Sequence, residues 1–131
     1  MHPMKAMRQY QKVNSHAQTS EASPHRLVQM LMEGALDRLA QAKGFMGRGE
    51  IARKGEMLGK AIDIIHGLRL GLDPEKATPG HLDNLDALYG YMMSRLTEAN
   101  RNNDEQMINE VARLLITVKA GWDAIATVAV E

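Results

Sequence analysis

The sequence predicts an all-α fold: an antiparallel up-and-down four-helix bundle preceded by a short N-terminal helix or arm. Apolar residues recur at helical spacing in four segments, 24–46, 50–72, 80–101 and 104–127. Proline, glycine and polar residues separate these segments, and such short connections predict antiparallel neighbours. Aromatic residues make up only 4% of the chain, and β-branched residues are sparse before the last segment, which disfavours a sheet.

The first predicted helix has clear signals at both ends. Serine is a favoured N-cap and proline fits the first helical position, so Ser23 and Pro24 predict its start. Gly44, Gly47 and Gly49 predict its end and a short turn before the second helix.

The first two helices carry more apolar residues than a bundle core requires. In the second helix, which Asp73 and Pro74 end, these residues spread over about 180° of the surface, whereas a core-facing stripe needs about 100°. Leu70 stands alone on the polar side. Two explanations stay open: a fuller core that the N-terminal segment helps to cover, or a surface for a protein partner. The ten methionines and the glycines within helices fit either explanation.

The third and fourth helices have unambiguous apolar faces. Thr78 and Pro79 predict the start of the third helix, and the polar turn 100–103 separates it from the fourth. Asn103 and Gln106 resemble a capping box for the fourth helix. The residues that share the apolar face of the fourth helix are Met107, Ile108, Val111, Leu114, Leu115, Val118, Trp122 and Ile125.

Residues 1–22 form an N-terminal arm that differs from the bundle domain, residues 23–131. The charged residues of the arm up to position 20 are all basic, and Met7, Tyr10 and Val13 give it one weak apolar edge. The nearest place for that edge is the wide apolar face of the first two helices. Our hypothesis is that the arm caps this face in the free protein and is displaced when a partner binds.

Composition disfavours several classes of function. Sixteen Lys and Arg balance sixteen Asp and Glu, and a chain without net charge is not typical of nucleic-acid binding. The chain has no cysteine, which rules out disulfides, thiol catalysis and thiolate metal sites. No apolar run approaches the roughly 20 residues of a membrane span, and polar residues interrupt any signal peptide at the N-terminus.

The sequence lacks the motifs of an enzyme or a metal carrier. No Glu-x-x-His pair of a di-iron bundle occurs, and Asp63 and His66, although spaced like ligands, lie on a polar helix side. Nucleophile-elbow and phosphate-loop motifs are also missing. We therefore expect a binding protein without catalytic residues, metal or cofactor. A metal- or haem-carrying bundle and a self-assembling structural bundle remain the alternatives.

Five stretches resemble one family, the flagellar secretion chaperone FliS. Ser20–Leu36 reads SEASPHRLVQMLMEGAL and is similar to the opening of that family's first bundle helix. The stretch 84–100, NLDALYGYMMSRLTEAN, is similar to its most recognisable block. The remaining matches are KAIDII at 60–65 followed by Leu72 and Asp73, EVARLL at 110–115 with Trp122, and YQKV at 10–13.

The resemblance implies an export chaperone of the cytosol that binds the disordered C-terminal segment of flagellin and prevents its premature polymerisation. The chaperone would then deliver flagellin to the flagellar type III export apparatus, so components of the export gate are further partners. We expect neither nucleic acid as a partner nor insertion into a membrane, and whether the chain forms a homodimer stays open. The residues expected to contact partners are Met7, Tyr10, Val13, Met32, Leu36, Met57, Ile62, Ile64, Leu70, Leu85 and Tyr89.

Overall fold

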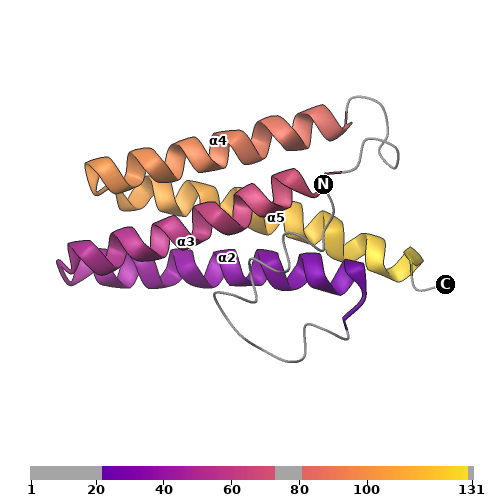
Figure 1. The fold of residues 1–131 in the computed structure, drawn as a ribbon, viewed down its shortest axis with the longest axis horizontal. Helices are drawn as coiled ribbons and strands as arrows, with labels where there is room; N and C mark the ends of the chain where they lie inside the picture. Colours follow the sequence, from indigo (N-terminus) through magenta and orange to yellow (C-terminus); the bar gives the residue numbers. More distant parts are fainter. Residues whose placement is uncertain (1–21, 73–80, 130–131) are drawn as a thin grey trace.

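The computed structural model describes residues 22–72 and 81–129 of the chain (Figure 1). These residues form four α-helices, α2 (Pro24–Gly47), α3 (Ile51–Leu70), α4 (His81–Asn102) and α5 (Glu105–Ala129). Within the described ranges the chain contains no strand. The N-terminal arm predicted for residues 1–22 lies, except for Ala22, outside the described residues.

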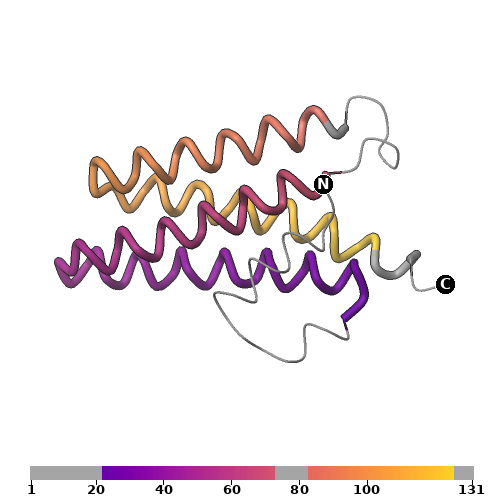
Figure 2. Tube along the Cα trace, in the orientation of Figure 1, coloured from indigo at the N-terminus to yellow at the C-terminus, as the bar shows by residue number. Residues whose placement is uncertain are grey.

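The four helices form an antiparallel bundle. Helices α2 and α4 run in one direction and α3 and α5 in the other, as the trace in Figure 2 shows. Helix α2 packs against α3 and α5, and α4 packs against the same two helices from the other side. The all-α four-helix bundle predicted from the sequence is therefore confirmed.

Local residue chemistry explains where α2 begins and ends. The Ser23 side chain accepts a hydrogen bond from the backbone N–H of Arg26 at 3.1 Å, and Pro24 occupies the first turn, as predicted. The connection to α3 needs a left-handed residue, and Gly49 supplies it with φ +74°. At the end of α3 the structure is shorter than predicted, because Gly71 caps the helix and Leu72 lies beyond it.

The predicted capping box at the start of α5 is wrong by one residue. Asp104, not Asn103, is the cap: its Oδ1 accepts hydrogen bonds from the backbone N–H groups of Gln106 at 2.9 Å and Met107 at 3.4 Å. Asn103 instead takes the left-handed conformation, φ 53°, that turns the chain between α4 and α5. Asparagine and aspartate can each act as an N-cap or take the left-handed conformation, so the residue types alone do not decide which of the two caps α5.

This assignment predicts different costs for two neighbouring substitutions. Asp104→Ala removes the acceptor of two helix N–H groups and is expected to lower the free energy of unfolding by about 1 kcal/mol. Gln106→Ala, which would break the capping box predicted from sequence, is expected to change it by less than about 0.5 kcal/mol. Urea unfolding of the two variants checks this, and a larger cost for Gln106→Ala would contradict the assignment.

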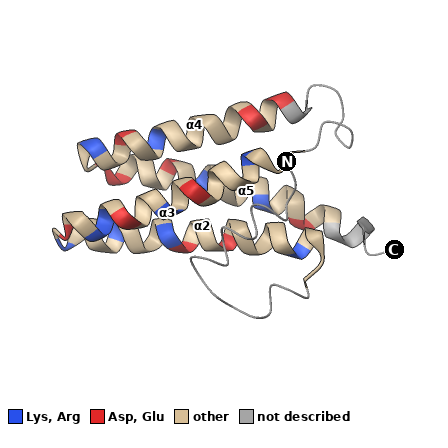
Figure 3. Ribbon diagram, in the orientation of Figure 1, with Lys and Arg blue, Asp and Glu red and all other residues tan. Residues whose placement is uncertain are grey.

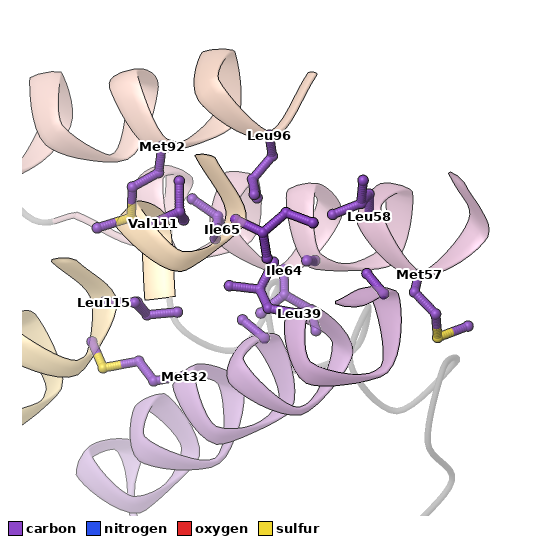
Figure 4. Packing of buried hydrophobic residues seen from close by; sticks show 14 of the residues in the cluster. Met32, Leu39, Met57, Leu58, Ile64, Ile65, Met92, Leu96, Val111 and Leu115 are labelled. Atoms are coloured by element: carbon purple, nitrogen blue, oxygen red, sulfur yellow. The ribbon is translucent and has the colours of Figure 1, made fainter. Parts of the chain in front are cut away.

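The hydrophobic core lies where the apolar faces of all four helices meet (Figure 4). Its largest fully buried side chains are Leu31, Met32, Leu39, Leu58, Ile64, Ile65, Met92, Leu96, Ile108, Val111 and Leu115. The apolar faces predicted for the helices are thus largely the buried ones. Ile125 is an exception, since 51% of it is exposed near the end of α5, which in Figure 1 runs past the first turn of α2.

Two polar contacts join α3 to α4. The side chain of Lys54 is buried, and its Nζ donates to the backbone oxygen of Asn100 at 2.9 Å, near the end of α4 where a cation is favoured. Further along, the Arg69 guanidinium donates to both carboxylate oxygens of Asp86, from Nε at 2.7 Å and from Nη2 at 3.1 Å. A Cβ at Gly90 would lie 3.1 Å from Arg69 Nη1, so this glycine leaves room for the guanidinium.

Candidate partner-binding surface

Four of the residues predicted to contact a partner are core residues in the structure. Met32, Met57, Ile64 and Tyr89 are exposed by only 1%, 8%, 2% and 3%. Their side chains pack among the other buried residues of the bundle (Figure 4 labels Met32, Met57 and Ile64). A partner could contact them only after the surrounding core had opened.

The other residues predicted to contact a partner differ in how exposed they are. Leu36, Ile62 and Leu85 are half-buried and pack against the core from its edge. Leu70 faces outward and is 37% exposed, in the orientation that its position on the polar side of α3 indicates. Its role in binding a partner stays a prediction. The remaining three, Met7, Tyr10 and Val13, lie outside the described residues, so the capping hypothesis stays a prediction as well.

Helix α5 carries a set of exposed, uncharged residues, of which the apolar pattern of the sequence included only Ile125, as part of the predicted core face. We call the following residues the α5 strip: Ile116, Thr117, Ala120, Gly121, Ala124 and Ile125 are all exposed and carry no charge, and they wind around half of the helix, so that Ile116 and Ile125 lie on opposite sides of it. Ile116 and Ile125 are 54% and 51% exposed. The sequence does contain a signal for the strip, namely the absence of charged residues at these positions. It is easily missed, because alanine and glycine contribute little to an apolar pattern.

The charged residues of the same part of α5 face α2 instead. The Lys119 Nζ lies 2.8 Å from Asp123 Oδ2 and 3.7 Å from Glu33 Oε2, and Gln29 Nε2 donates to Asp123 Oδ1 at 2.6 Å. The hydrogen bond from Lys119, and after it the one from Gln29, hold the pKa of Asp123 below its ordinary value. The bond to Asp123 in turn raises the pKa of Lys119. The network therefore leaves the outward side of α5 without charge over this stretch.

An aromatic contact closes the same end of the α2–α5 interface. The rings of His25 and Trp122 stack with centroids 4.7 Å apart and planes within 8°. The Trp122 indole N–H donates to the backbone oxygen of His25 at 3.0 Å. The first turn of α2 is thereby held against α5.

A second group of exposed side chains lies between α4 and α5. Glu110 accepts a hydrogen bond from the Tyr91 hydroxyl at 2.6 Å and one from Arg95 Nε at 2.8 Å. The first of these bonds is the main reason that the pKa of Glu110 is lowered and that of Tyr91 raised. The hydroxyl bond to Glu110 and the Arg95 guanidinium, 5.9 Å from the ring centroid, hold the Tyr91 side chain in place, although 43% of the residue is exposed.

The described residues show no arrangement typical of a metal or nucleic-acid site. Among them, no three His, Asp or Glu side chains lie close enough together to hold an ion, and Asp63 and His66 are both exposed. Basic and acidic residues are interspersed over the described helices in Figure 3. None of the described helices is long and apolar enough to cross a bilayer.

Comparison with known proteins gives a consistent result over nearly the whole chain. The family model described as "Flagellar protein FliS" matches residues 6–129. The flagellar secretion chaperone FliSB of Pseudomonas aeruginosa is 56% identical over 127 residues, which span 96% of this chain and 99% of that protein. The flagellar secretion chaperone FliS of Vibrio cholerae is 46% identical over 92% of this chain and 88% of its own. That of Salmonella typhimurium is 41% identical over 96% and 93%.

Proposed function

The chain belongs to the flagellar protein FliS family, and on that premise we propose that it is the cytosolic export chaperone of flagellin. It binds the disordered C-terminal segment of flagellin, prevents premature polymerisation and hands flagellin to the flagellar type III export apparatus. The observation that carries the proposal is the family match over residues 6–129, together with relatives that are named flagellar secretion chaperones. Because those relatives are chaperones, the chain is not an enzyme, in agreement with the missing catalytic motifs.

The physical character of the surface supports a flexible apolar client. A disordered segment loses conformational entropy when it binds, and it must offset that loss by burying a broad apolar surface. The bundle supplies such surface at the α5 strip, at the ring of Tyr91 and at Leu70. An amphipathic helix laid along bundle helices is the mode of recognition that fits these exposed side chains best.

Co-expression with flagellin tests the function directly. We expect the chain and full-length flagellin to elute together in size-exclusion chromatography, with light scattering that gives the mass of a defined complex. Flagellin without its C-terminal segment should elute apart from the chain. The matched control is flagellin shortened by the same length at its N-terminus, which should still form the complex. Equal binding by both shortened forms would contradict the assignment of the C-terminal segment.

A further inference from the structure

We propose that helix α5 consists of two parts that open separately. Residues 105–115 belong to the bundle core. The part from residue 116 to the end of the helix, which we call the α5 latch, separates from α2 as one unit while the rest of the bundle stays folded. The opened state uncovers the side of α2 that faces α5 near His25 and Glu33. This inference concerns the free chain and goes beyond the proposed function, and neither depends on the other.

The buried contacts of α5 are confined to its first part. Ile108, Val111 and Leu115 are each 0% exposed. Among residues 116–125 none is buried, and Val118 and Trp122 pack against the core with only part of their surface covered. Because burial of apolar surface is the main source of stability, the latch is held more weakly than the first part of the helix.

The contacts that join the latch to α2 include several polar ones. Gln29 Nε2 donates to Asp123 Oδ1 at 2.6 Å, and Lys119 Nζ lies 3.7 Å from Glu33 Oε2. The side chains of Lys119, Asp123 and Glu33 are 21%, 38% and 46% exposed. Water can replace each partner at such solvent-accessible positions, so these contacts add little net stability to the closed state.

Two further features favour opening of the latch. The ring of His25 stacks on Trp122, and its Nε2 atom is buried without a hydrogen bond to any described residue. Separation of the two rings would let water satisfy that atom. Gly121 lowers the helix propensity of the latch, and a Cβ at this position would meet no atom within 4 Å, so packing within the bundle does not require the glycine.

Native-state hydrogen exchange, resolved by NMR, tests the proposal on the unchanged chain. After correction for intrinsic rates, the amides of residues 120–125 should exchange at least about tenfold faster than those of 109–115. Low concentrations of urea should hardly change exchange in the latch, because its opening exposes little surface, whereas exchange in the first part should accelerate.

Two other exchange patterns would overturn the proposal. Equal protection and the same urea dependence in both parts would show that α5 opens only when the whole bundle unfolds. Protection that declines steadily from residue to residue toward the C-terminus would show that the helix frays from its end and that no latch opens as a unit.

Two carboxylates with matching contacts separate latch opening from general destabilisation. Asp123 in the latch and Glu110 in the first part of α5 each accept two side-chain hydrogen bonds. Asp123→Ala weakens the closed state relative to both the opened and the unfolded state, so it should accelerate exchange in both parts by about fivefold. Glu110→Ala leaves the latch contacts intact and should accelerate exchange in the first part alone.

The matched control can contradict the proposal in either direction. Acceleration of both parts by Glu110→Ala would mean that the latch opens only together with the core. An unchanged rate in the latch of Asp123→Ala would mean that the contacts of this carboxylate do not hold the latch closed. Thermal melts of the two variants should show that both fold.

Discussion

Replacing Leu115 by alanine is expected to lower the free energy of unfolding by about 3 kcal/mol. Leu115 is fully buried among residues from other helices of the bundle. Truncation removes the favourable transfer of its side chain from water and leaves a cavity that the rigid helices refill only in part. Urea unfolding of the variant and of the unchanged protein measures the difference.

The adjacent residue provides the control. Ile116 follows Leu115 in the same helix but is 54% exposed, so Ile116→Ala should change the free energy of unfolding by less than about 0.5 kcal/mol. The two variants remove side chains of similar size from the same helix turn, and burial is the main difference between them. A similar loss of unfolding free energy for both variants would contradict the burial of Leu115 and the exposure of Ile116.

Alkaline pH is expected to destabilise the protein through Tyr89. Burial raises the pKa of Tyr89 to about 12 from an ordinary value of 10.0. The folded state therefore holds the phenol proton more firmly than the unfolded state does. Below pH 10 both states keep the proton and the stability is unaffected. As the pH rises from about 10 to 12 the unfolded state ionises first, and about 2–3 kcal/mol of stability is lost.

The variant Tyr89→Phe isolates this effect. Its unfolding free energy should fall less steeply between pH 10 and 12 than that of the unchanged protein. Tyr91, whose pKa is raised chiefly by its hydrogen bond to Glu110, is present in both proteins, so its contribution cancels in the comparison. Parallel declines for the two proteins would mean that the Tyr89 hydroxyl is not buried in solution.

The helices could be predicted from the sequence because their signals are local. Ser23 and Pro24 fix the start of α2 by a hydrogen bond and a backbone angle that involve only their neighbours. The α4–α5 turn shows the limit of this reasoning. Asn103 and Asp104 are both suited to capping, and only the backbone conformation at Asn103 decides which of them caps α5.

The surface was predicted less well because exposure depends on the neighbouring helices. A wide apolar arc does not reveal which part another helix covers, so Ile64, in the core, and Leu70, at the surface, were both expected to contact a partner. Ile125 matched the buried face of α5 by spacing and is nonetheless exposed. The polar network around Lys119 and Asp123 joins residues more than 90 positions apart, which periodicity within one helix cannot show.

The stacking of Trp122 on His25 gives the protein an intrinsic optical reporter. The chain has one tryptophan, so its whole indole emission comes from the place where the first turn of α2 meets α5. Separation of the two helices there would bring the indole into contact with water and shift its emission to longer wavelength, without any added label. Emission spectra therefore distinguish a partner that binds the intact bundle from one that pulls α5 away from α2.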